Sequence, residues 1–170
     1  MVKLNPEDFG NDFPFITPGD FTKSGKYIIK TDRQLSRIGV HRLKNKTVPK
    51  DSIIVTCIGS DMSKVAITSE DSITNQQINA IVVAQKELSE YLFHRLNAMS
   101  NELKSMALGS STMPLLNKSE FEKISIPIPP SDKLLIFSQF TDVTNKTIII
   151  KLKENNKLTE LQSLLLAKMG

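Results

Sequence analysis

The sequence predicts an α+β fold, with a β-rich domain over residues 1–130 and one long helix over residues 131–170. Short β-branched runs bounded by glycine, proline, asparagine and aspartate predict the strands. Pro127, Pro129 and Pro130 then end this region, because proline fixes φ and has no backbone N–H. Neither proline nor glycine follows before the last position, so about 39 residues can form one helix of roughly 58 Å.

The first fifty residues predict turns and short extended pieces. Pro18-Gly19 and Ser24-Gly25 are typical turn pairs, and they flank short strand-like segments. The polar tract TDRQLSRIGV, residues 31–40, predicts one or two helical turns.

The middle of the chain predicts a sheet. The run SIIVTCIG, residues 52–59, is apolar and β-branched, which predicts a buried strand. SKVAIT, residues 63–68, alternates and predicts its hairpin partner across the turn GSDM. INAIVVA, residues 78–84, has the same character as the first run and predicts a third strand.

Two further helices are predicted between this sheet and the prolines. LSEYLFHRLNAMSNELKSMA predicts an amphipathic helix that ends at Gly109, because large apolar residues recur at helical spacing: Leu88, Leu92, Leu96, Met99, Leu103 and Met106. SSTMPLL predicts a loop, and NKSEFEKI predicts a short capped helix. The alternation in ISIPIPP predicts a short edge strand that runs into a polyproline-like turn. Ser131 and Asp132 predict the N-cap of the long helix.

The long helix carries an apolar stripe typical of a coiled coil. Its members step by three or four residues: Phe137, Phe140, Thr144, Ile148, Leu152, Asn155, Leu158, Leu161, Leu165 and Met169. A small domain cannot cover a stripe of this length, so we expect a partner helix and self-association. Asn155 within the stripe can fix the register of that pairing. A helical hairpin that turns at residues 154–156 is the alternative.

Positive charge is concentrated in one part of the chain. The formal net charge is +4, yet residues 21–50 hold nine lysines and arginines and one acid, which gives +8. A basic run is often only a solvated surface, but phosphate neutralisation also requires clustered cations. The candidates for DNA contact are Lys23, Lys26, Lys30, Arg33, Arg37, Arg42, Lys44 and Lys46, together with the loop residues Ser110, Ser111 and Thr112.

The residue types in this set predict different roles. Arginine offers a bidentate fork for guanine, whereas lysine is a point charge suited to phosphate. If residues 31–40 are helical, Arg33 and Arg37 share one face at a separation of four residues. The small polar residues at 110–112 also have a purely structural interpretation, as a tight connection to the short helix that follows.

The sequence shows no catalytic or metal-binding constellation. His41 and His94 lie 53 positions apart, and Cys57 is the single cysteine. The Gly25-Lys26 pair lacks the spacing of a phosphate-binding loop. We therefore expect a protein that is not an enzyme and has no metal and no cofactor. One cysteine fits a reducing compartment, and neither a leader nor a spanning segment is indicated, so we expect a cytoplasmic protein without membrane contact.

Several motifs together resemble the specificity subunit of type I restriction-modification systems. The series comprises PFITPGDF, PKDSIIVTCIGSDMSKVAIT, TNQQINAIVV, YLFHRL, GSSTMPLLNKSEFEKISIPIPP and a leucine-rich helix that ends in LLLAKM, and it runs from about Asn5 to Met169. The framework residues that match the family are Gly109, Pro114, Asn117, Pro127, Pro129 and Pro130. Residues that contact DNA vary between members of the family, so none is carried over.

The resemblance implies how such a protein works. A complete subunit has two target recognition domains, each of which reads one part of a split DNA sequence, and two long helices that pair antiparallel as a spacer. The implied partners are double-stranded DNA, the methyltransferase subunits and, through them, the restriction subunit, with adenine as the methylated base. This chain holds one such unit and lacks the usual opening segment. It therefore matches a half-subunit that dimerises, a fragment of a longer protein or an inactive remnant. SDMSKV also stands where a more glycine-rich turn is common.

Two other functions stay open at this point. The chain matches the recognition portion of a single-chain DNA adenine methyltransferase or of a restriction-methylase fusion, and binding of S-adenosylmethionine by the chain alone favours that function. It also matches a coiled-coil assembly protein whose basic region is only solvated, which predicts no salt-dependent binding to DNA.

Overall fold

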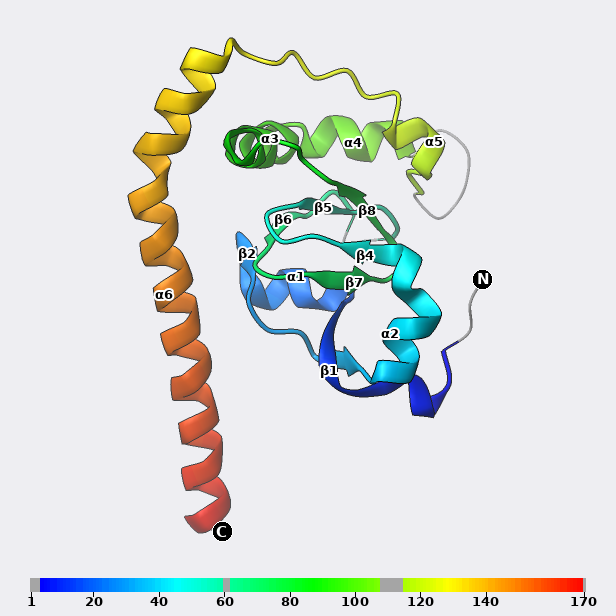
Figure 1. Cartoon of the computed structure of the whole chain (residues 1–170), viewed down its shortest axis with the longest axis vertical. Helices are drawn as coiled ribbons and strands as arrows, with labels where there is room; N and C mark the ends of the chain where they lie inside the picture. The colour runs from blue at the N-terminus through cyan, green and yellow to red at the C-terminus, as the bar shows by residue number, and fades with distance from the viewer. Residues whose placement is uncertain (1–3, 60–61, 108–114, 170) are drawn as a thin grey trace.

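The computed structural model describes residues 4–59, 62–107 and 115–169, and its fold is α+β, as predicted (Figure 1). The strands described form two four-stranded sheets, in the orders β3-β1-β7-β4 and β2-β6-β5-β8. The strands are β1 (Phe9–Ile16), β2 (Tyr27–Ile28), β3 (Arg33–Leu35), β4 (Thr47–Val48), β5 (Ile53–Thr56), β6 (Val65–Thr68), β7 (Ser72–Thr74) and β8 (Ile78–Ile81). The helices are η1 (Pro6–Asp8), α1 (Pro18–Ser24), α2 (Arg37–Leu43), η2 (Lys44–Lys46), α3 (Lys86–Ala98), α4 (Ser100–Ala107), α5 (Lys118–Phe121) and α6 (Ser131–Met169).

The predicted three-stranded sheet is confirmed. β5 pairs antiparallel with β6 on one side and with β8 on the other. Ile53, Ile54 and Val55 of β5 are fully buried, so their side chains fill the core on both faces of the sheet. This is why a continuous apolar run, rather than an alternating one, marks the strand.

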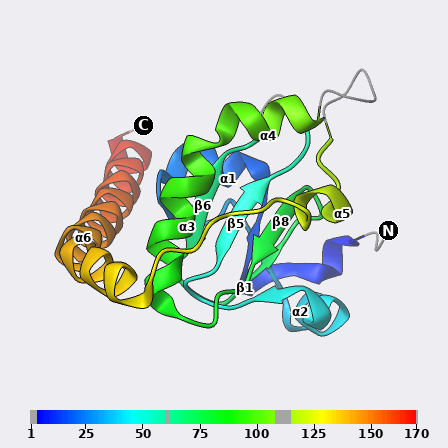
Figure 2. The same cartoon turned by 90° about the horizontal axis from the view of Figure 1, so that it is seen from above.

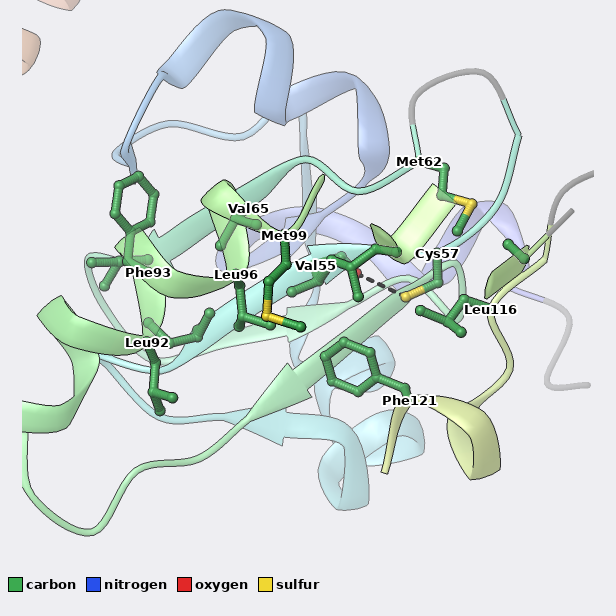
Figure 3. Packing of buried hydrophobic residues seen from close by; sticks show 14 of the residues in the cluster. Val55, Cys57, Met62, Val65, Leu92, Phe93, Leu96, Met99, Leu116 and Phe121 are labelled. Atoms are coloured by element: carbon green, nitrogen blue, oxygen red, sulfur yellow. Dashed lines mark hydrogen bonds between the residues drawn. The ribbon is translucent and has the colours of Figure 1, made fainter. Parts of the chain in front are cut away.

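The main core lies between this sheet and the helices α3, α4 and α5 (Figure 3). Leu96, Leu103 and Leu116 are almost completely buried there. Cys57 lies in the same cluster, where its Sγ donates to the carbonyl oxygen of Val55. Burial raises the pKa of the Cys57 thiol to about 11, so this cysteine is an unreactive core residue at neutral pH.

The second sheet was not predicted as a whole. Its strand β1 pairs antiparallel with β3 and parallel with β7. A separate cluster of Phe15, Leu35, Leu43 and Ile73 packs against it, with Val40 partly buried at its edge. Because Leu43 and Val40 belong to α2, this cluster fixes α2 on the second sheet.

Three predictions near the N-terminal half and the first long helix are wrong. The Pro18-Gly19 pair begins α1 rather than a turn, because Thr17 and Asp20 form a capping box. The helical turn predicted within residues 31–40 is confirmed from Arg37 onward, where α2 begins, but Arg33 lies in strand β3, so the shared helix face of Arg33 and Arg37 is wrong. The predicted helix up to Ala107 is two helices, α3 and α4, which meet at Met99 and run at an angle to each other over the sheet (Figure 2).

The segment before the long helix is extended but is not a strand of either sheet. Ile124 and Ile126 pack against the main core, and the hydroxyl of Tyr91 donates to the carbonyl oxygen of Pro127 over 2.6 Å. The predicted edge strand is therefore wrong, because the chain crosses α3 rather than joining a sheet. The short capped helix is confirmed as α5, where Asn117 accepts from the amide of Glu120.

The long helix is confirmed as α6, which is continuous through 39 residues. Residues 154–156 lie within it, so the alternative of a helical hairpin is wrong. The carbonyl of Pro130 accepts from the amides of Lys133 and Leu134, which places Ser131 and Asp132 inside the first turn rather than at the cap. Among the residues described, no helix is long and apolar enough to span a membrane.

Candidate nucleic-acid interface

The helix α2 is mounted closely on the turn η1. A Cβ atom at Gly39 would lie 2.2 Å from the backbone oxygen of Asp8, so only glycine fits this contact. The amide of Ser36 donates to that same oxygen over 2.9 Å, and the hydroxyl of Ser36 donates to the carbonyl of Glu7 over 2.7 Å. These contacts hold the start of α2 in one position.

Arg42 completes this mount. Its guanidinium lies 2.6 Å from the Asp8 carboxylate, which is fully buried, and 3.2 Å from Glu7. A buried carboxylate needs such a partner, because burial without one is costly. Arg42 was a candidate for DNA contact, and the structure gives it a structural partner instead.

The opposite face of α2 carries a row of exposed side chains. Arg37, His41 and Lys44 follow at i, i+4 and i+7, and all are exposed. Lys46 follows in η2 and is also exposed. Within the described part of the chain, no side chain of these four forms an ion pair with an acid. We call Arg37, His41, Lys44 and Lys46 the α2 ridge.

Arg33 lies beside the start of this ridge, on the edge strand β3. Its guanidinium lies 5.5 Å from the ring centre of Phe9, and the side chain is exposed. A shallow pocket next to it is lined by Asn5, Gly10 and Gln34, among others. Arginine and glutamine are the side chains that read guanine and adenine edges, respectively.

Three other predicted lysines have acidic partners. Lys23 pairs with Asp32 over 2.7 Å on the surface, and this hydrogen bond raises the pKa of Lys23. Lys30 pairs with Glu160 of α6 over 2.6 Å. Lys26 is largely buried against Glu90, so we leave it out of the candidate interface.

The candidate interface does not include the predicted loop residues. Ser110, Ser111 and Thr112 lie outside the described residues, as do the framework residues Gly109 and Pro114.

The helix α6 has two opposite apolar faces where the sequence predicted one stripe. Along the first half of α6, one face packs on α3 and the main core through Leu134, Phe137, Ile148, Ile149 and Leu152. The other face is exposed, at 54% or more, and comprises Ile136, Phe140, Val143, Ile150, Leu158, Leu161 and Leu165. We call these seven residues the outer stripe.

The predicted stripe mixed residues from both faces. Phe137, Ile148 and Leu152 are partly covered by the chain's own domain, which corrects the expectation that all of them need a partner helix. Phe140, Leu158, Leu161 and Leu165 belong to the outer stripe, and Asn155 is exposed.

Sequence reasoning also missed several residues of the site. Gly39 and His41 carry no signal in the charge count, although the close helix contact and the i+4 spacing depend on them. The division of α6 into two faces was readable in principle, because Ile136, Phe140 and Val143 repeat on their own with heptad-like spacing.

Comparison with known proteins relates the chain to one protein family. The chain matches the family model described as the type I restriction modification DNA specificity domain over residues 1–160. It is 35% identical to the specificity subunit of the type I restriction enzyme HindI from Haemophilus influenzae, over 98% of this chain and 36% of that subunit. The chain thus spans just over a third of the length of the curated relative that it matches.

A solved structure shares the fold. It comes from work on complex assembly and conformational transition of the type I R-M system. The TM-score is 0.57 at 13% identity, with 95% of this chain and 39% of that chain covered.

Proposed function

Because the chain belongs to the family of type I restriction-modification DNA specificity domains, we propose that it reads DNA sequence as part of a specificity subunit. In this role it directs methyltransferase subunits and, through them, a restriction subunit to a DNA site, and it catalyses no reaction itself. The observation that carries the proposal is the α2 ridge, a rigidly mounted row of basic side chains within a chain of this family.

The α2 ridge has the geometry of a groove reader. A short helix with side chains at i, i+4 and i+7 fits the major groove of B-DNA, which is about 12 Å wide. Arg37 reads a base edge in this arrangement, because a guanidinium can bond both acceptors of guanine. Lys44 and Lys46 contact phosphates, and Arg33 with Gln34 extends the readable surface along β3.

The helix α6 serves as half of a spacer. Its outer stripe pairs with the equivalent helix of a second recognition unit, since seven exposed large apolar side chains on one face are otherwise costly in water. The recognition domain occupies the opposite face of α6, so a partner helix can approach without displacing it. The helix α2 lies on the other side of the β-rich body from α6 in both views (Figures 1 and 2).

Sequencing of methylated DNA tests the proposal. The chain is combined with the methyltransferase subunit of its system, and the methylated motif is read from DNA treated with the assembly. We expect one defined motif, which Arg37→Ala changes or abolishes. Lys153→Ala is the matched control, because Lys153 is an exposed base on α6 and outside the α2 ridge. Methylation that is identical with and without the chain contradicts the proposal, and binding of S-adenosylmethionine by the chain alone favours a methyltransferase fragment instead.

A further inference from the structure

A buried polar network joins α6 to the recognition domain. Lys26, at the start of β2, ion-pairs with Glu90 of α3, and their side chains are only 13% and 7% exposed. The Lys26 ammonium also donates to Oδ1 of Asn145 over 2.7 Å, and Nδ2 of Asn145 donates to Oε2 of Glu90 over 2.8 Å. Each of the three side chains therefore contacts the other two.

The network is closed around one position of α6. Asn145 uses both ends of its amide, so neither a flipped amide nor a different residue of α6 at this point satisfies Lys26 and Glu90 together. His94 supports the same carboxylate from one turn further along α3, with its Nε2 at 3.0 Å from Oε1 of Glu90. Its ring also stacks edge-on against Phe137 of α6.

The surrounding apolar contacts define this position less sharply than the polar network does. Phe137 and Ile148 are eleven residues apart, about three turns, and Ile148 and Leu152 are four residues apart, about one turn. Hydrophobic burial itself has no direction. A slip of α6 by three or four residues is about 4.5 to 6 Å. A slip of three residues that brings Phe137, Phe140 and Leu152 to the positions of Leu134, Phe137 and Ile149 keeps part of the apolar face on α3, although Lys151 then replaces Ile148. The residues that such a slip brings to the position of Asn145 are Thr141, Asp142, Ile148 and Ile149, and none of them offers both a donor and an acceptor of amide geometry.

From these contacts we infer that Lys26, Glu90 and Asn145 form a register lock, and that Asn145 is a positioning residue for the spacing of the DNA site. This inference rests on the proposed function. A slip of one helical turn would move the recognition domain by about 5.4 Å along α6, which exceeds the base-pair rise of about 3.4 Å. A spacer with an unlocked register would therefore accept sites whose two parts are one or two base pairs closer or further apart.

A purely stabilising role for the network makes a different prediction. If the three residues only stabilise the fold, changing Asn145 lowers the unfolding midpoint but leaves the position of α6 and the accepted spacing unchanged. The informative variant is Asn145→Leu, which keeps the Lys26–Glu90 pair and a side chain of similar size while removing the register-specific amide. Asn155→Leu is the matched control, because Asn155 is an exposed asparagine on the same helix that belongs neither to the outer stripe nor to the network, contrary to the pairing role expected from the sequence.

Spin-label distances test the lock without DNA. Labels are placed on Asn45→Cys and Lys168→Cys, which are exposed positions on the recognition domain and on α6, while Cys57 is buried. Labelled protein is diluted with unlabelled protein, so that only distances within one chain are measured. We expect one narrow distance in the parent and in Asn155→Leu, and a broadened or two-component distribution, with components about 5 Å apart, in Asn145→Leu. An unchanged distribution in Asn145→Leu overturns the inference.

Methylation of DNA with altered spacing tests the consequence. The two parts of the methylated motif are separated by the natural distance or by one or two base pairs more or less. The parent and Asn155→Leu should prefer the natural distance by at least tenfold, and Asn145→Leu should lose most of that preference while it keeps the same two half-motifs. Retained preference overturns the role in spacing. If the parent assembly methylates no defined motif, the proposed function fails, and the distance measurement alone then decides on the lock.

Discussion

Single residues decide whether the α2 ridge can face outward. Gly39 permits the helix to touch the backbone of η1, and Arg42 neutralises the buried Asp8 below it. Neither residue has to touch DNA to matter for recognition. The α2 ridge is therefore sensitive to changes on its hidden side as well as on its exposed one.

Gly39→Ala tests the hidden side. The added Cβ would lie 2.2 Å from a backbone oxygen that cannot move independently, so α2 must shift. We expect a loss of about 1 to 3 kcal/mol in unfolding free energy, measured by urea denaturation, and a clear loss of DNA affinity. Gly19→Ala is the control. Gly19 lies in helix α1, and a Cβ atom added there would have its nearest neighbour at 3.9 Å. Equal stability of both variants would contradict the close contact.

Cys57 predicts a pH dependence. Burial raises its pKa from the ordinary value of 9.0 to about 11, so the folded state favours the neutral thiol. This stabilisation is fully present below pH 9 and is lost as the pH rises from about 9 to about 11, because the unfolded thiol ionises first. Between pH 7 and pH 10 the unfolding free energy of the parent should fall by about 1.4 kcal/mol more than that of Cys57→Val, measured by denaturant unfolding. Parallel stability curves would contradict this.

At the scale of elements, the features that follow from the local sequence pattern were predictable. The hairpin of β5 and β6, the strand β8 and the cap at Asn117 all follow from local composition, and the structure confirms them. The break at Met99 and the strand β3 depend on the elements that they pack against, and a local sequence pattern does not show those contacts. The TPGD motif was readable as a capping box, but its proline and glycine favoured a turn.

The candidate site was predictable in its charge and not in its geometry. The charge count found Arg37, Lys44 and Lys46 because they are bases in a basic window. It could not separate them from Lys26 and Arg42, whose partners Glu90 and Asp8 are distant in the sequence. Only the fold distinguishes a base that is paired from one that is exposed.

The α2 ridge predicts a specific salt dependence. Lys44→Ala combined with Lys46→Ala should weaken DNA binding and lower the slope of log affinity against log salt by roughly one for each lost phosphate contact. Mobility shift or anisotropy at a series of salt concentrations measures this slope. Lys23→Ala should change it less, because Lys23 is already paired with Asp32. An unchanged slope in the double variant would remove both lysines from the interface.

Arginine geometry gives a second prediction for this element. Arg37→Lys keeps the charge of the α2 ridge but removes the bidentate fork, so it should change the methylated motif more than the nonspecific affinity for DNA. Arg33→Lys should behave similarly if β3 takes part in readout. Motif sequencing and binding to unrelated DNA measure the two effects. An intact motif and methylation rate in both variants would place base readout elsewhere in the domain.

At the scale of the whole molecule, α6 divides the surface between two tasks. Its inner face packs on α3 and the main core, and its outer stripe is left exposed along nearly the full length of the helix. Two such chains can pair antiparallel through their outer stripes, with one recognition domain on each outer side. The distance between the two α2 ridges is then set by α6 and by the position at which each domain is held on it.

Self-association through the outer stripe is the prediction at this scale. Leu158→Asp with Leu161→Asp places two charges on the outer stripe beyond Leu152, the last residue of α6 that packs on the main core, so pairing should weaken while the domain stays folded. Light scattering at tens of micromolar should show a dimer for the parent and a monomer for the variant, with equal helix content by circular dichroism. Thr159→Asp with Gln162→Asp is the matched control, because these exposed residues add the same charge to the same turns of α6 outside the outer stripe. A parent that is monomeric with α6 intact would contradict the pairing of two copies. The outer stripe would then be expected to meet a helix of another chain or of a longer protein.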